Sequence, residues 1–180
     1  MVFTPQPRPT TSSSQEGSAL STLGTSHIWK AKTEGKHRFF TWLLVQERIH
    51  TADVLLVKGV QGNPVCILCD QEQETAAHLC LHCPYAREVW CHIQVQTQGL
   101  VVIPEPGLSL QDWWNSSLLV AGHHNRGSVA ATLMYTAWNI WNERNRRVFK
   151  GLSILPASLM HLIMADMEVR KRACEAREAA

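Results

Sequence analysis

The sequence lacks a long apolar run, an apolar leader and a strong charge bias, and each absence excludes a class of protein. The opening residues, MVFTPQPRPTTSSS, contain no apolar core of a secretory signal, and no later stretch approaches the length of a membrane span. We therefore expect an intracellular protein, in the nucleus or the cytoplasm, without a membrane partner. The net charge is only +2, so any contact with nucleic acid must rest on a local basic patch.

Sustained alternation of apolar and polar residues, which would indicate strands, is also missing, and no internal repeat is evident. What is present is apolar: 45% of the 180 residues are hydrophobic, and seven tryptophans stand against two tyrosines. Because tryptophan is costly to leave exposed, this composition indicates a packed interior. The Pro-, Ser- and Thr-rich segment 1–26 has no apolar periodicity, and we expect it to be disordered.

Apolar residues recur at helical spacing along the rest of the chain, which predicts an all-α protein. Cap and breaker residues predict where the helices begin and end. The expected helices are 37–48, a short one capped by Thr51, one opened by Pro84, a short one around 113–119, a long one capped by Ser128 and ended by Gly151, and one over 156–178. The stretch 123–127 is expected to break the helical pattern.

Four cysteines lie between positions 66 and 83 beside histidines, which indicates a metal site in a reducing compartment rather than disulfides. Cys66 and Cys69, two residues apart, can place both thiolates on one metal through a tight turn, and His78 and Cys83 then complete a tetrahedron. Zinc suits such a mixed thiolate and imidazole set. Because the protein fills all four positions, the site is structural and offers no place for a reactive water.

The sequence leaves other interpretations of these cysteines open. Cys80 and His82 lie in the same window, and a ligand set with Cys80 in place of Cys83 is an alternative, although Cys80 fits better as a small apolar residue behind the loop. Ordinary buried thiols and a redox pair are further alternatives, but no thioredoxin-like strand precedes the motif. Cys91 and Cys174 are lone cysteines with no expected role.

Two basic clusters are candidate phosphate contacts, and together they form the expected nucleic-acid surface. They comprise Lys30, Lys32, Lys36 and Arg38, and Arg144, Arg146, Arg147 and Lys150. For the second cluster, a solvated helix face is the alternative.

Aromatic residues accompany the first basic cluster and are candidates for stacking on bases. They are Trp29, Phe39, Phe40 and Trp42. Their helical spacing favours positions in the core instead. We expect the helix that carries Val89 and Trp90 to cover Phe39, Phe40, Trp42 and Leu43.

Six short segments between positions 28 and 90 follow the order and spacing of a known family. They are IWKAK (28–32), FFTWLL (39–44), RIHTADVLL (48–56), CILC (66–69), ETAAHL (74–79) and CPYAREVW (83–90). This part of the chain resembles the reverse-transcriptase zinc-binding domain. That domain occurs near the C-terminus of the polyprotein of plant LINE-type (non-LTR) retrotransposons and in host genes derived from them. The later AWNIWNERNRRVFKG (137–151) is similar to the segment that commonly follows it.

The resemblance implies that Cys66, Cys69, His78 and Cys83 hold one structural zinc ion, and that the domain holds template RNA or target DNA near a polymerase. The chain itself contains no Tyr/Phe-Ala-Asp-Asp motif of a polymerase palm and no spaced carboxylate set for an RNase H. We therefore expect no enzymatic activity, and an isolated fragment of such an element or a protein derived from one.

Two functions follow from the sequence. The first is a zinc-stabilised, non-catalytic accessory module that contacts RNA or DNA and has no small-molecule substrate. The alternative is a structural or protein-interaction module, with an unidentified protein partner, in which zinc serves only the fold. The expected architecture is a small helical bundle with a zinc-stapled loop between helices. Its divisions are a disordered segment (1–26), the zinc-binding domain (27–96), a loop and short helix (97–127) and a C-terminal helical region (128–180).

Overall fold

The computed structural model describes residues 26–178, and its regular elements are helices, which confirms the expected all-α class. In chain order they are α2 (Gly35–Val45), α3 (Ala52–Val57), the π-helical turn η1 (His78–His82), α4 (Pro84–Gln96), α5 (Leu110–Val120), α6 (Gly122–Lys150) and α7 (Pro156–Glu178). Within these residues, strand pairing is limited to one isolated bridge between Val65 and Gln73. None of the described helices is both long and apolar enough to cross a membrane.

The predicted disordered segment, 1–26, lies outside the described residues except for Ser26, which is part of a helical segment at 26–30.

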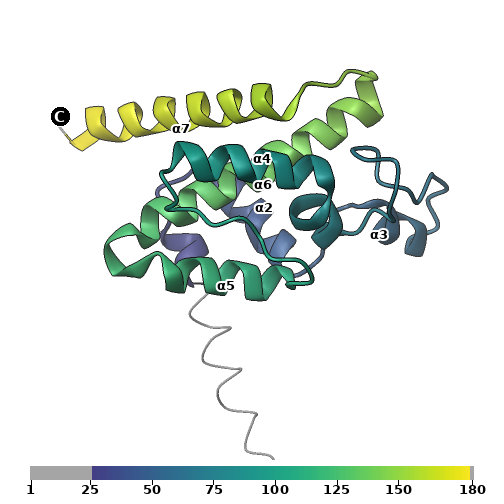
Figure 1. Cartoon of the computed structure of the whole chain (residues 1–180), viewed down its shortest axis with the longest axis horizontal. Coiled ribbons are helices and arrows are strands. Elements are labelled where there is room, and N and C mark those ends of the chain that lie inside the picture. The colour runs from purple at the N-terminus through teal and green to yellow at the C-terminus, as the bar shows by residue number, and fades with distance from the viewer. Residues whose placement is uncertain (1–25, 179–180) are drawn as a thin grey trace, which may run out of the picture.

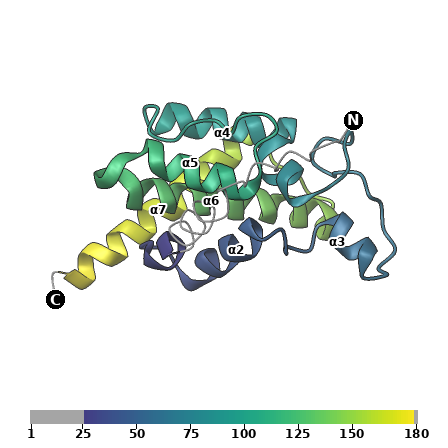
Figure 2. The same ribbon diagram turned by 90° about the horizontal axis from the view of Figure 1, so that it is seen from below.

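The 29-residue helix α6 is the central element, and α2, α5 and α7 each pack against it. Figure 1 shows α4 lying beside α7 on one side of α6, with α5 on the opposite side. In Figure 2, α2 runs along the edge of the bundle that lies away from α4. Both views place α3 and the irregular segment that follows it at one end of the molecule.

Several helix ends follow the residues that predicted them. Pro84 occupies the first turn of α4, and Pro156 begins α7. Gly151 ends α6 in the left-handed conformation, with φ 63°, and its amide donates a hydrogen bond of 3.1 Å to the Arg147 carbonyl. These signals act within one turn of chain, which is why the sequence alone locates them.

The start of α6 was predicted wrongly. The helix begins at Gly122 rather than at a Ser128 cap, so the stretch 123–127 is helical. A single residue, Ala121, separates α6 from α5, and Arg126 Nε donates to the Leu118 carbonyl at the end of α5 (3.0 Å). This contact supplies a partner for one of the carbonyls that a helix end leaves without one.

Three tryptophans form the tightest part of the core. Trp90 of α4 and both Trp113 and Trp114 of α5 are at most 1% exposed. The rings of Trp90 and Trp113 meet edge to face with their centroids 5.7 Å apart. Trp90 Nε1 also donates to the Cys80 carbonyl (2.8 Å), so the indole joins the tryptophan core to the segment that contains the metal ligands.

The predicted partner of the α2 aromatic residues was also wrong. Phe40 is buried, but it packs on α6 rather than on α4, with its ring 5.3 Å from that of Trp138 and 6.1 Å from that of Trp141. Trp29 and Phe39 are about half exposed. Helical spacing identifies which side of a helix is apolar but not which neighbour covers it, and the distant α6 takes that place.

Candidate metal centre

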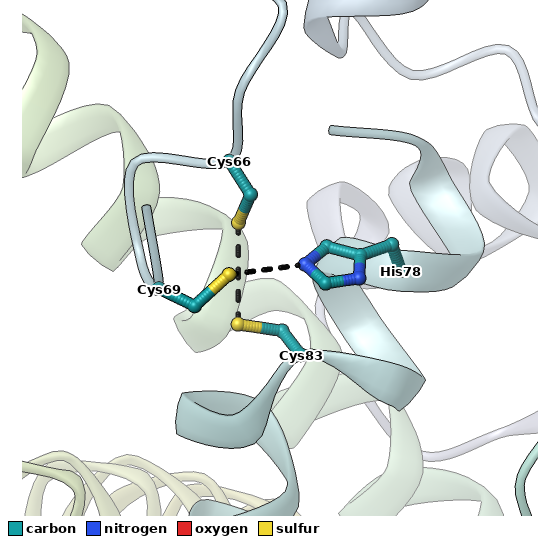
Figure 3. Close-up of side chains that lie close together, drawn as sticks. All are labelled: Cys66, Cys69, His78 and Cys83. Atoms are coloured by element: carbon teal, nitrogen blue, oxygen red, sulfur yellow. Dashed lines mark hydrogen bonds between the residues drawn. The ribbon is translucent and has the colours of Figure 1, made fainter. Parts of the chain in front are cut away.

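Cys66 and Cys69 lie on a short hairpin turn. The Cys66 amide donates to the Glu72 carbonyl (2.8 Å) across the hairpin. The amides of Cys69 and Asp70 both donate back to the Cys66 carbonyl, at 3.3 and 2.8 Å, which closes the turn. Asp70 has φ 55°, a left-handed conformation that Asp adopts more readily than most residues. The turn therefore holds the two thiols on the same side of the backbone (Figure 3).

His78 and Cys83 lie at the two ends of the π-helical turn η1. The Cys83 amide donates to the His78 carbonyl (2.7 Å), five residues earlier. A π-turn holds more residues per turn than an α-turn, and such turns often occur at functional sites. Cys83 then leaves the helical conformation, with ψ 132°, before Pro84 starts α4. The Thr75 hydroxyl accepts a hydrogen bond from the His78 amide (3.1 Å) and fixes the start of η1.

The side chains of Cys66, Cys69, His78 and Cys83 point toward a common centre, as Figure 3 shows. Their ligand atoms all lie within 4.8 Å of one another. The Sγ atoms of Cys66 and Cys83 are 3.9 Å apart, and Cys69 Sγ is 3.4 Å from His78 Nε2. Tetrahedral zinc requires ligand separations of roughly 3.5–3.8 Å, so small adjustments suffice. The cluster is compatible with one structural zinc ion.

The protonation of these thiols also favours a cation between them. The hydrogen bond that Cys66 donates to Cys83, together with burial, raises the pKa of Cys66 to about 12. Accepting that bond lowers the pKa of Cys83. The two thiols are thus coupled through one hydrogen bond, and a divalent cation would supply the charge that allows both to ionise.

The structure separates Cys80 and His82 from the ligand set. Cys80 is fully buried, lies outside the cluster and stays neutral because burial raises the pKa of its thiol. His82 Nε2 lies 3.0 Å from the Leu108 carbonyl, to which it donates, so this ring holds the loop before α5. The alternative set with Cys80 in place of Cys83 therefore has no geometric support.

A buried ion pair connects the metal segment to α6. The Glu74 carboxylate accepts three hydrogen bonds of 2.7–3.1 Å from the Arg144 guanidinium, and both side chains are under 10% exposed. The same carboxylate accepts from the Ala52 amide (2.9 Å) at the start of α3. Thr51 was the expected cap, but its hydroxyl makes no cap bond to this helix. Glu74 therefore joins α3, the metal segment and α6.

Arg147 holds the turn between the two cysteines of the CxxC motif. Its guanidinium lies over the Tyr85 ring, 4.7 Å from the centroid. Nη1 of the same group donates to the carbonyls of Ile67 and Leu68, at 3.3 and 3.2 Å. Because Tyr85 follows Cys83 by two residues, Arg147 connects both halves of the ligand set.

Glu143 is fully buried and organises the end of α6. Its carboxylate accepts hydrogen bonds from Arg146 and, at 2.9 Å, from Arg147 Nε. It also accepts from the Ile154 amide (3.0 Å), while the Tyr85 hydroxyl donates to the Ile154 carbonyl (3.0 Å). These hydrogen bonds attach the turn between α6 and α7 to Tyr85, two residues after the ligand Cys83.

The two predicted basic clusters differ in how far their side chains are engaged within the protein. Arg144, Arg146 and Arg147 form ion pairs within the protein, and Lys150 is exposed at the end of α6. In the first cluster, Lys30, Lys32 and Lys36 are exposed, and Arg38 donates to the Trp29 carbonyl (3.2 Å). Sequence analysis did not identify Glu74, Glu143 or Tyr85. The sequence around a buried acidic residue does not differ from that around an exposed one. Neighbouring residues therefore gave no signal for Glu74 and Glu143.

Comparison with known proteins matches residues 13–90 to the family described as zinc-binding in reverse transcriptase. The match confirms the resemblance and includes all four residues of the metal cluster. It covers the zinc-binding domain and no catalytic domain of a reverse transcriptase. It begins upstream of position 27, where the sequence suggested that the domain starts. Searches of curated proteins and of solved structures found no match.

Proposed function

We propose that this zinc-binding domain of the reverse-transcriptase type acts as a non-catalytic accessory module that contacts nucleic acid. The observation that carries the proposal is the contrast between its basic clusters. The arginines of α6 form ion pairs within the protein, whereas the side chains of Lys30 and Lys36 are exposed before and at the start of α2. Exposed lysines within so short a segment make a surface suited to phosphates.

The ligand set of the metal centre supports a non-catalytic function. Zinc in catalytic sites keeps one position for water or substrate, whereas this cluster offers four protein ligands. The thiols of Cys66 and Cys83 are fully buried, which keeps solvent away from half of the ligand set. The zinc ion would then serve to order the segment that holds α3, η1 and α4 against α6.

The test is a titration of the zinc-loaded full chain with labelled RNA and DNA oligonucleotides at several salt concentrations. We expect affinity to fall steeply with salt. Lys30→Glu and Lys36→Glu should each weaken binding, and each lost phosphate contact should reduce the logarithmic salt slope by about 0.7 for a single strand. Lys58→Glu, an exposed lysine beyond α3, is the matched control for net charge and should have little effect.

The second candidate function is a structural or protein-interaction module in which zinc serves only the fold. It is favoured by the internal ion pairs of Arg144 and Arg147, because these two residues of the predicted basic surface bind carboxylates of the protein itself. Failure of the folded, zinc-loaded chain to bind either nucleic acid at low salt would leave this function in place of the first.

A further inference from the structure

Two exposed aromatic side chains and a third that is half-buried lie beside the first basic cluster, on the outer side of the bundle. Trp29 is 50% exposed, Phe39 is 54% exposed and Trp42 is partly buried. Single exposed apolar residues are common on protein surfaces. Here, however, the rings of Phe39 and Trp42 stack on each other, with centroids 5.9 Å apart and planes inclined by 27°.

The geometry of α2 directs this stacked pair away from the protein. The buried side of the helix consists of His37, Phe40, Thr41 and Leu44. Phe39 and Trp42, three residues apart, lie together on the opposite side. In Figure 2, α2 forms an outer edge of the bundle, and Phe39 on this side of the helix is 54% exposed.

Positive charges flank the aromatic pair on both sides of α2. Lys36 lies one turn before Phe39 and extends toward Trp138, whereas Arg38 lies one turn before Trp42. Arg38 Nη1 donates to the Trp29 carbonyl (3.2 Å), which holds the helical segment 26–30 and its exposed indole close to α2. The surface that we name the aromatic platform is thus Trp29, Phe39 and Trp42 with Lys30, Lys36 and Arg38.

We propose that the aromatic platform binds single-stranded nucleic acid, with unpaired bases stacked on its rings and phosphates held by its basic residues; this rests on the proposed function. A duplex hides base faces between neighbouring pairs, so flat exposed rings can stack only on bases that are unpaired. The flanking positive charges favour a polyanion over an apolar protein surface. The acidic residue closest in sequence, Glu34, is engaged by the Tyr135 hydroxyl and lies 2.9 Å from His37 Nδ1.

The experiment compares a labelled oligouridylate of about 12 nucleotides with the same length of duplex, using the zinc-loaded full chain at low salt. We expect the single strand to bind more tightly than the duplex and to quench part of the tryptophan emission. Phe39→Ala should weaken single-strand binding by roughly 5- to 150-fold, and Phe39→Tyr should retain most of it. Phe149→Ala, an exposed phenylalanine (76%) beside Lys150 on α6, is the matched control and should not change affinity.

The other outcomes are distinct. Equal affinity for single strand and duplex, with no effect of Phe39→Ala, would overturn the aromatic platform and leave the basic nucleic-acid surface standing. Loss of binding in Phe149→Ala but not in Phe39→Ala would move the site to the end of α6. Absence of all nucleic-acid binding would overturn both proposals. Self-association that Phe39→Ala abolishes would then assign this surface to a second copy of the chain. Unchanged zinc content and helicity in each variant exclude misfolding as the cause.

Discussion

The metal end of the molecule, residues 59–83, and the tryptophan core are held together by different combinations of interactions. Residues 59–64 are exposed and belong to no helix or strand, whereas the ligands, the Glu74–Arg144 pair and the Arg147 contacts involve residues from Cys66 onward. The tryptophan core consists of Trp90, Trp113 and Trp114, which are buried in contact with one another. The metal end also buries Leu79 and Leu81 in the core, but it adds a buried ion pair and a candidate ligand set, whereas the tryptophan core relies mainly on burial of apolar surface.

The two regions pack against each other between η1 and α4, and a hydrogen bond from Trp90 Nε1 to the Cys80 carbonyl, between His78 and Cys83, joins them directly. This contact means that disorder at the metal end should reach the core through α4, although the two regions respond to different perturbations. Four experiments test the difference, in order of decreasing effect.

Loss of the metal should have the largest effect. Structural zinc contributes on the order of 10–16 kcal/mol of apparent binding free energy, comparable to the whole stability of a domain, about 5–15 kcal/mol. We expect Cys83→Ser to abolish copurified zinc, lower helicity and shift tryptophan emission to the red as Trp90 becomes exposed. Metal analysis, circular dichroism and fluorescence measure these changes.

The matched control for this prediction is Cys91→Ser. Cys91 is exposed on α4, so this variant should keep its zinc. If Cys80→Ser lost the metal while Cys83→Ser retained it, the assigned ligand set would be wrong. An emission spectrum and melting temperature that do not change on chelation would show that zinc is incidental to the fold.

Breaking the buried ion pair should have the next largest effect. Arg144→Met leaves the Glu74 carboxylate buried without its cation, which typically costs about 3–5 kcal/mol. The control is Arg172→Met, which breaks the exposed Arg172–Glu168 pair and should cost about 1 kcal/mol or less. Urea denaturation of the zinc-loaded proteins measures both. Equal costs would mean that the metal alone, without the ion pair, orders this end.

The contact between the two regions should have a moderate effect. Trp90→Phe removes the indole N–H and leaves the buried Cys80 carbonyl without this donor, at a cost of about 1–3 kcal/mol. Because this bond joins the regions, the variant should also hold zinc less tightly in competition with a chelator. A loss of stability with unchanged zinc affinity would indicate that the metal end and the tryptophan core are energetically independent.

The smallest effect should come from mild acid acting on His37, far in sequence from the metal ligands. Burial lowers the pKa of His37, against a smaller opposite effect of Glu34. The unfolded chain therefore binds the proton more readily than the folded chain. The contribution of neutral His37 to the free energy of unfolding is present above pH about 6.5 and is lost as pH falls below it, by at most about 1.4 kcal/mol per pH unit. His37→Gln should reduce this pH dependence, measured as melting temperature with zinc content checked at each pH.

The wild-type protein, measured at the same pH values, provides the reference for this titration. An unchanged pH dependence in His37→Gln would instead assign the acid sensitivity to the metal ligands.

The sequence by itself determined the features that depend on neighbouring residues. Cys66, Cys69, His78 and Cys83 lie within one short segment, and their spacing alone indicated a zinc site before any fold was known. The helix ends at Pro84, Pro156 and Gly151 were equally local, since ring closure at proline and the left-handed conformation of glycine act within a single turn.

Only the tertiary structure decided which distant residues meet. Arg144 is 70 positions from Glu74, and Arg147 is 79 positions from Leu68, so no spacing rule could assign these arginines to the metal end rather than to the surface. The same holds for α2: the sequence indicated which side of this helix is apolar, but not that α6 packs against that side. Local chemistry determines a ligand set because few bonds separate its members, whereas burial and ion pairing depend on packing between elements that the chain brings together only on folding.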